Sequence, residues 1–198
     1  MRPLLQPNSY QSHLETAHGI WRNIVLPGDI VIDATCGNGH DTLFLANLLL
    51  QNGTLYALDI QPEAIAKSRQ SIEEAFSKEV CARIKFVEGC HSKFPSEIQS
   101  GSVKLIVYNL GYLPGGDKAL TTQLQTTLES VTSALELLTT GGMISITCYP
   151  GHDEGMIEEK ALVEFAAKLD SKTWICSHQR WINRQRAPSL LLISRRKG

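Results

Sequence analysis

The sequence predicts an α/β fold: a mostly parallel, seven-stranded sheet with helices on both faces and a closing antiparallel hairpin. Short runs of β-branched and apolar residues alternate along the chain with longer stretches of helical periodicity. Glycine or proline stands at most of the changes between them. This alternation is typical of a parallel sheet covered by helices on both sides.

The chain begins with a predicted amphipathic helix over residues 8–25. Apolar side chains recur there at spacings of three and four, which places them on one helical face. They are Tyr10, Leu14, Ala17, Trp21 and Val25. Pro27 and Gly28 interrupt the pattern. We therefore predict one domain over 1–198, with an N-terminal helix in 1–27 and the core in 28–198.

The core is predicted to alternate between strands and helices. Its strands cover residues 30–32, 54–60, 82–87, 103–108, 143–148, 173–181 and 189–194. Its helices cover residues 41–50, 62–78, 121–139 and 154–169, the third closed by Gly141 and Gly142. Five βα units followed by a hairpin form the order of a nucleotide-binding fold. Its ligand lies beyond the carboxyl ends of the first and fourth strands.

Composition and charge exclude some classes of protein and disfavour others. Hydrophobic residues make up 42% of the chain and charged residues 20%, which excludes a disordered protein. The formal net charge of −1 excludes a polybasic nucleic-acid binder but permits a local basic face. A two-domain dehydrogenase is disfavoured because the core leaves little chain for a substrate domain.

The cysteines and the apolar runs bear on metals, membranes and location. The five cysteines are odd in number and none has C-x-x-C spacing, so we predict reduced thiols and no metal. No apolar run has the length of a membrane span, and residues 1–10 lack the apolar core of a signal peptide. We therefore predict a cytoplasmic protein without membrane contact. An organellar location after removal of a transit peptide stays open.

The strongest local signal is the glycine-rich turn from Asp33 to Asp41, which follows a strand and opens a helix. Gly37 and Gly39 let the backbone pass close to a ligand. Asp59, twenty residues after Gly39, ends the next strand, where a carboxylate grips a ribose diol. A dinucleotide needs a third glycine where this chain has a threonine. S-adenosylmethionine needs an acidic group near its ammonium, for which we predict Asp33. A dinucleotide and a plain tight turn remain the alternatives.

Two further turns are predicted at the same edge of the sheet. Cys90 and His91 follow the third strand, where such folds place the adenine, although His91 reads equally well as a polar loop residue. His152 follows the fifth strand and is a candidate general base or RNA contact, because histidine titrates near neutral pH. We expect Tyr149 beside it to pack a base. An exposed loop histidine of no consequence is the alternative.

The turn after the fourth strand carries the predicted acceptor site. Amine-methylating enzymes of this fold have Asn/Asp-Pro-Pro-aromatic there, and this chain has Asn109 and Tyr112 at the matching ends without the prolines. An amide oxygen accepts the N–H of an amine and aims its lone pair, and transfer then depends on in-line positioning. Tyr112 would stack on a base. Alternatively, Asn109 caps the loop and Tyr112 belongs to the core.

Basic residues gather in the final hairpin turn. Arginines interleaved with an aromatic side chain suit phosphate contact and base stacking. The predicted RNA-binding residues are Arg180, Trp181, Arg184 and Arg186. A solvated hairpin is the alternative. His13, His18 and Arg22 on the first helix extend this face only weakly.

Taken in order, the segments DATCGNGHDTLFLA, ALDIQPEAI, EGCH, YNLGYLPGGDK and CYPGH resemble the MnmM/YtqB-type family of rRNA methylases. The resemblance implies a Rossmann-like class I methyltransferase that uses S-adenosylmethionine. It implies methylation of 5-aminomethyl-(2-thio)uridine at the wobble position of tRNA, with the anticodon region as partner. The implied cofactor contacts are Asp33, Thr35, Asn38, Asp41, Asp59 and Gln61, and the implied acceptor-side residues are Asn109, Tyr112 and His152.

Other functions and assemblies stay open at this point. The same fold methylates exocyclic amines of rRNA or other RNAs. A non-catalytic RNA module that binds the cofactor is a further alternative, as is a small-molecule methyltransferase. Exposed helix faces would also allow two copies of the chain to form a homodimer.

Overall fold

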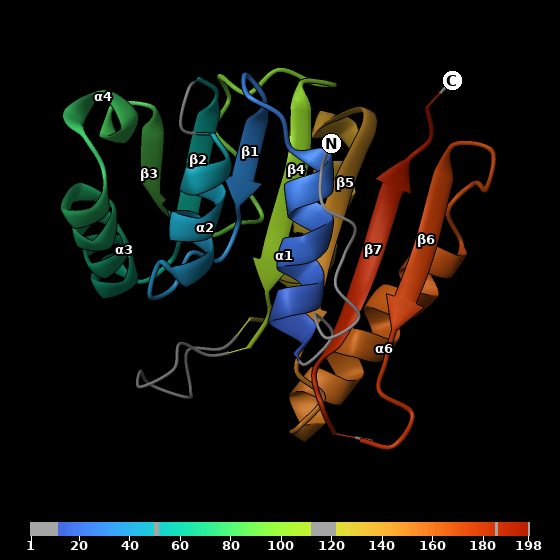
Figure 1. Ribbon diagram of the computed structural model, residues 1–198. Coiled ribbons are helices and arrows are strands. Elements are labelled where there is room, and N and C mark those ends of the chain that lie inside the picture. The colour runs from blue at the N-terminus through green and yellow to red at the C-terminus, as the bar shows by residue number, and fades with distance from the viewer. Residues whose placement is uncertain (1–11, 50–51, 112–121, 185, 198) are drawn as a thin grey trace.

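The computed structural model describes residues 12–49, 52–111, 122–184 and 186–197, and these form one seven-stranded sheet flanked by helices (Figure 1). The sheet order is β3-β2-β1-β4-β5-β7-β6. The strands are β1 (Ile30–Asp33), β2 (Thr54–Asp59), β3 (Ile84–Glu88), β4 (Val103–Asn109), β5 (Leu138–Cys148), β6 (Trp174–Gln179) and β7 (Ser189–Arg195). The helices are α1 (His13–Ile24), α2 (His40–Leu48), α3 (Pro62–Ala75), α4 (Lys78–Cys81), α5 (Leu124–Leu137) and α6 (Asp153–Ala167).

The sheet confirms the predicted topology. The five strands from β3 to β5 are parallel, and β7 pairs antiparallel with both β5 and β6. The chain first builds outward from β1 through β2 to β3, then crosses back to place β4 on the other side of β1. The carboxyl ends of β1 and β4 therefore adjoin, which is where such a sheet opens a crevice for its ligand.

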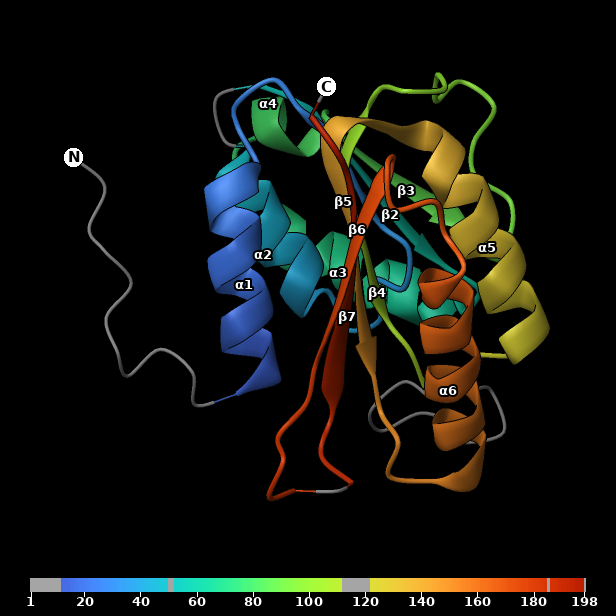
Figure 2. The ribbon, with the colours of Figure 1, turned by 90° about the vertical axis from the view of Figure 1, so that its right-hand side faces the viewer.

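Alternating side chains of the strands feed two separate cores. Val31 and Leu105 join the core under α1, α2 and α3. Ile32 and Ile106, their neighbours along the strands, join the core under α5 and α6. Figure 2 shows the two helical layers on opposite sides of the sheet. Burial on both faces explains why the strands read as continuous apolar runs.

Helix α1 lies outside the repeating βα units and covers β4, β5 and β7. Ser12 caps it by accepting the N–H of Glu15 at 3.1 Å. Trp21 is fully buried, and its indole Nε1 donates to the Ser145 hydroxyl of β5 at 2.9 Å. This bond and the apolar face of the helix fix α1 with its first turn at the carboxyl edge of the sheet (Figure 2).

Three details of the prediction are wrong. Helix α3 ends at Ala75, and the separate helix α4 follows. Residues 89–102 between β3 and β4 form no helix, so the chain has four βα units rather than five. Gly141 and Gly142 do not close α5 but lie within β5. A Cβ at Gly142 would stand 3.0 Å from the Val103 carbonyl oxygen, so this glycine permits the close approach of β5 to β4.

None of the helices in the described ranges is long and apolar enough to cross a membrane. Within the same ranges, no group of three or more His, Cys, Asp and Glu side chains is arranged to hold a metal ion.

We expect Gly39→Ala to destabilise the fold by about 2 kcal/mol or more. Gly39 has φ +83°, and an added Cβ would lie 2.8 Å from the Cα of Ser68 on α3. Gly101→Ala is the matched control, since Gly101 also has a positive φ (+72°) but open space around it. Urea unfolding should show a loss of about 1 kcal/mol for the control. Equal losses for the two variants would contradict the close packing of α3 on this turn.

Candidate active site

A cavity of about 1230 Å³ opens at the carboxyl edge of the sheet. It is larger than the roughly 300–1,000 Å³ typical of a pocket for one small ligand. Loops after β1, β2, β3, β4 and β5 line it, together with α1 and the β6–β7 hairpin. The predicted site residues that line it are Thr35, Gly37, Asn38, Asp41, Asp59, Gln61, Cys90, His91, Asn109, Tyr149, His152 and Arg186. Tyr112 lies outside the described residues.

Asp59 joins two loops at one end of the cavity. Its carboxylate accepts the backbone N–H of Gly37 at 2.9 Å and that of Gln61 at 3.0 Å. The first bond ties the β1–α2 loop to the end of β2, and the second starts the turn into α3. A carboxylate has about four acceptor positions, so two remain for a diol in the cavity.

Asp33 lies beneath the glycine-rich turn rather than in the cavity wall. It is 1% exposed, and it accepts the Thr42 hydroxyl at 2.6 Å and the Thr35 N–H at 3.3 Å. Burial, reinforced by the charge of Asp41, raises the pKa of Asp33 to about 7. The predicted contact with a ligand ammonium therefore needs correction, because the carboxyl is turned to the start of α2.

Gly39, also predicted as a cofactor contact, is likewise absent from the cavity wall. It caps α2 in a left-handed conformation and gives α3 the room to pack. Gly37 and Asn38 present the turn to the cavity instead.

His91 stands at the cavity with an unsatisfied ring atom. The side chain is 9% exposed, its ring meets Tyr108 edge-on at 5.8 Å, and Nδ1 has no hydrogen-bond partner among the described residues. Burial lowers the pKa of His91, and the charge of Asp59, which raises it, is the smaller effect. The ring is therefore neutral at pH 7. A buried, unpaired ring nitrogen indicates that a bound group completes this part of the site.

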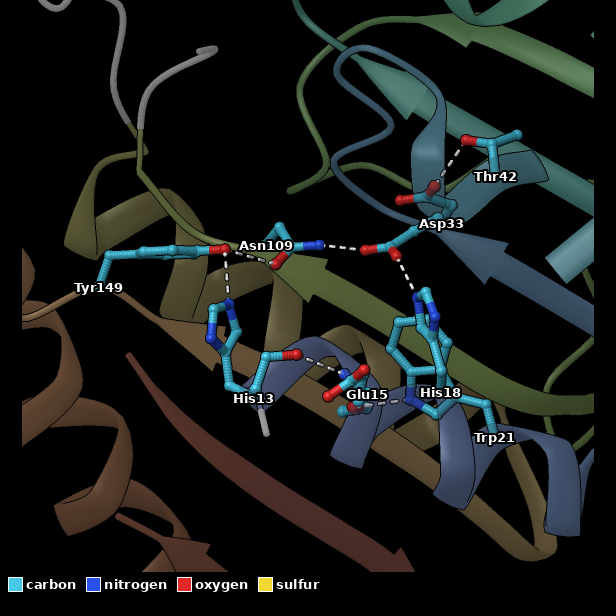
Figure 3. Close-up of polar contacts among 11 residues, drawn as sticks. His13, Glu15, His18, Trp21, Asp33, Thr42, Asn109 and Tyr149 are labelled. Atoms are coloured by element: carbon cyan, nitrogen blue, oxygen red, sulfur yellow. Dashed lines mark hydrogen bonds and ion pairs between the residues drawn. The ribbon is translucent and has the colours of Figure 1, made fainter. Parts of the chain in front are cut away.

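Asn109, at the end of β4, is held by three hydrogen bonds, of which Figure 3 shows the one to the Tyr149 hydroxyl. Its backbone N–H donates to the Thr35 hydroxyl at 2.7 Å. Its side-chain Nδ2 donates to the Asp41 carboxylate, and its Oδ1 accepts the Tyr149 hydroxyl at 3.3 Å. The carboxylate accepts only, so it fixes which way the amide faces. One lone pair of Oδ1 remains for a ligand.

Helix α1 supplies two histidines to this network. His18 Nε2 meets the Asp41 carboxylate at 2.6 Å while its ring stacks on Phe44, with centroids 3.8 Å apart. His13 Nε2 lies 3.2 Å from the Tyr149 hydroxyl (Figure 3). Asp41, predicted as a cofactor contact, thus links α1 to Asn109. His13 and His18 stand one helical turn before the buried Ala17 and Trp21, a spacing that points them inward.

His152 caps α6 through its ring Nδ1, the unprotonated nitrogen that a general base would need. Its Nδ1 accepts the Gly155 N–H at 3.1 Å. A neutral ring whose Nδ1 accepts carries its proton on Nε2, and that atom is then a hydrogen-bond donor. The geometry therefore favours a capping role for His152 over the predicted base.

Two adjacent acidic residues of α6 anchor the loops on either side of it, and sequence reasoning missed both. Glu158 accepts the hydroxyls of Thr122 at 3.0 Å and Thr127 at 2.7 Å. Thr122 in turn accepts the N–H of Gly111, so the two ends of the segment after Asn109 are joined. Burial raises the pKa of Glu158 despite these bonds.

Glu159 anchors the β6–β7 hairpin in the same way. It accepts the Ser189 hydroxyl and lies 3.2 Å from His178 Nε2. Of the predicted RNA-binding residues on the hairpin, Arg186 reaches the cavity. Arg184 is exposed, Trp181 is half-buried, and Arg180 lies 3.9 Å from Glu159.

Comparisons with known proteins agree with this architecture. Residues 55–195 match the sequence family described as "Putative rRNA methylase". The chain belongs to this rRNA methylase family. An Arabidopsis thaliana protein named tRNA (mnm(5)s(2)U34)-methyltransferase, chloroplastic, is 36% identical over 190 residues, which cover 93% of this chain and 69% of that protein.

Two solved structures of relatives superpose over nearly the whole chain. One, a "putative rRNA-methylase" from Clostridium thermocellum, is 36% identical with a TM-score of 0.87 and covers 97% of this chain and 100% of its own. The other, SMU.1697c from Streptococcus mutans in complex with SAH, is 28% identical with a TM-score of 0.81 and covers 98% and 99%. The predictions of a class I methyltransferase fold and of S-adenosylmethionine as cofactor are confirmed.

We expect the stability of the protein to fall between about pH 4 and pH 7 because of Asp33. The folded-state pKa of about 7 exceeds the ordinary value of 3.8. The folded state therefore binds the extra proton, and stability is lost as pH rises through that window. Asp33→Asn should remove up to about 4 kcal/mol of this dependence in urea unfolding across pH.

Asp170→Asn is the control, because hydrogen bonds lower the pKa of that exposed carboxyl and its effect has the opposite sign. An unchanged pH dependence in the Asp33 variant would show that the carboxyl is ionised in the fold.

Proposed function

We propose that this methyltransferase converts 5-aminomethyl-(2-thio)uridine to 5-methylaminomethyl-(2-thio)uridine at the wobble position of tRNA. The observation that carries the proposal is the Asn109 amide, whose orientation is fixed and whose Oδ1 faces a cavity with room for a second ligand beside the cofactor. The name of the Arabidopsis relative, with 36% identity, supports the same substrate.

The residues at one end of the cavity fit S-adenosylmethionine. Asp59 would accept a ribose diol, the turn at Gly37 and Asn38 would face the amino-acid part, and Cys90 and His91 would flank the adenine. The unpaired Nδ1 of His91 is the polar atom that a bound group would satisfy. When bound, the cofactor supplies an electrophilic methyl group on its sulfonium.

The other end suits a primary amine. A neutral amine donates one N–H to the free lone pair of Asn109 Oδ1, and its own lone pair then points back toward the cofactor end. The Asp41 carboxylate keeps the amide from rotating. Tyr149 would pack the uracil ring, since its ring lines the same wall. Positioning of this kind contributes most of the rate in such a transfer.

The contact with tRNA is proposed for the β6–β7 hairpin. Arg186 lines the cavity and Arg184 is exposed on the same hairpin turn, so these arginines could contact phosphates that flank an extruded nucleotide. Three further points remain predictions for this chain: contact with the anticodon region of tRNA, a homodimer, and a cytoplasmic location. The chloroplastic location belongs to the Arabidopsis relative.

Methylation of rRNA is the second candidate, because the family description names that substrate. We expect purified protein with S-adenosylmethionine to add one methyl to 5-aminomethyluridine in tRNA from cells lacking the gene, as measured by nucleoside mass spectrometry. Methylation of rRNA with none of tRNA would favour the second candidate. Cofactor binding without turnover on either RNA would favour a non-catalytic module.

Asn109→Ala in the same assay should lower the methyl-transfer rate by about a hundredfold or more while SAH still binds, because the amine loses its acceptor. Asn23→Ala is the control, since Asn23 is exposed on α1 and its side-chain amide donates to the Gly19 carbonyl of the same helix. Full turnover by a folded Asn109→Ala variant would remove Asn109 from the mechanism.

We expect Arg184→Ala/Arg186→Ala to weaken tRNA binding about tenfold or more and to reduce the salt dependence by about one phosphate contact per arginine. The control Lys168→Ala/Lys172→Ala removes the same charge near the C-terminal end of α6, at the opposite edge of the sheet (Figure 1). Filter binding over a range of salt concentrations measures both effects. Equal losses in the two double variants would indicate a general charge effect rather than a hairpin contact.

A further inference from the structure

Resting on the proposed function, we infer that His13 is the end of a proton relay that carries the proton of the substrate ammonium away through the Tyr149 hydroxyl. The relay consists of Tyr149, after β5, and His13, in the first turn of α1. The amine substrate enters as an ammonium, which has no lone pair, so a proton must leave before methyl transfer.

Two other candidate bases beside Asn109 and Tyr149, His152 and Asp41, already accept hydrogen bonds. His152 uses its Nδ1 to accept the Gly155 N–H. The Asp41 carboxylate bonds both Asn109 and His18. Tyr149 itself is no base, because burial and the charge of Asp41 raise the pKa of its hydroxyl to about 12. A hydroxyl of this kind passes a proton on as it receives one.

The Tyr149 hydroxyl stands between two acceptors. Its oxygen is 3.3 Å from Asn109 Oδ1 and 3.2 Å from His13 Nε2. Its single proton bonds one of them at a time. When a substrate N–H occupies Asn109 Oδ1, the hydroxyl proton turns to His13. The geometry then forms one continuous path from the ammonium to the His13 ring.

The step balances without any further reactant. The ammonium N–H bond breaks and its proton goes to the Tyr149 oxygen. The Tyr149 O–H bond breaks at the same time, and that proton goes to His13 Nε2. The products are a neutral amine with a free electron pair, an unchanged tyrosine and an imidazolium. The ring is half-buried, so it returns the proton to water on its outer side.

The surroundings of His13 suit this role. The titratable groups that face it from packed elements are Tyr149, after β5, and Asp41, on α2. Glu15 and His18 are its titratable neighbours on α1. Burial lowers the pKa of His13, so the ring is neutral and ready to accept at pH 7, while the charge of Asp41 favours the imidazolium once it forms.

The test is His13→Ala, measured as single-turnover methylation of tRNA carrying 5-aminomethyluridine between about pH 6.5 and pH 9.5. We expect the rate near neutral pH to fall about a hundredfold. The rate of the variant should rise with pH, because hydroxide replaces the relay, and it should recover when imidazole is added. Its solvent deuterium isotope effect should be larger than that of the wild type. SAH affinity should not change. Asn23→Ala, on the same helix, should behave like the wild type.

Tyr149→Phe supplies the second measurement. It should lose as much rate as His13→Ala, and the double variant should lose no more than either alone. A His13→Ala rate equal to that of the wild type overturns the relay. So does a loss that is constant across pH and insensitive to imidazole, because that pattern indicates a structural role.

A readout without turnover separates this inference from the proposed function. In ¹⁵N-histidine NMR of the whole protein, Tyr149→Phe should change the tautomer balance and the titration of His13, and an unchanged ring would overturn the relay. If the wild type methylates no 5-aminomethyluridine but the NMR coupling is present, the proposed function fails and the His13–Tyr149 pair stands.

Discussion

The active site depends on one carboxylate, Asp41, at the start of α2. It accepts hydrogen bonds from the Asn109 amide of β4 and the His18 ring of α1. Three elements that are distant in sequence, α1, α2 and β4, therefore meet at one carboxylate. A carboxylate is acceptor-only, and this fixes both the amide and the imidazole as donors toward it. Without it, the Asn109 amide could rotate, and the acceptor end of the cavity would lose its orientation.

The strand order and the edge that bears the site could be predicted from the sequence, because both follow from local signals. Apolar runs between glycines and prolines mark the strands, and polar turns after β1 to β5 must gather at one edge of a parallel sheet. Asp59 and Asn109 are therefore where the motifs place them. Gly142 was wrongly predicted to end a helix, because glycine is common at helix ends. Only the close approach of β5 to the Val103 carbonyl shows why a glycine is needed there.

The parts that could not be predicted rest on long-range contacts. His13 and Tyr149 are 136 positions apart, and no local pattern links them. Within the glycine-rich turn, the direction of each carboxyl depends on the backbone conformation. Asp33 points down to Thr42, while Asp41 points across to Asn109. The predicted cofactor contact of Asp33 assumed that an acidic residue near a ligand faces it, whereas the predicted contact of Asp41 fits its place in the cavity wall.

Helix α6 positions residues on one side of the cavity, whereas Asp41 orients Asn109 on the other. Glu158 holds Thr122 and through it Gly111, Glu159 holds the hairpin, and both carboxylates are buried on α6. Two hydroxyls satisfy Glu158, while Glu159 has one hydroxyl together with His178 and Arg180, and these partners offset the desolvation of the two carboxylates. Gly111, Thr122 and the hairpin proposed to contact RNA are thus positioned from one helix. A displacement of α6 would disturb the proposed amine and RNA contacts together while leaving the Asp59 end of the cavity in place.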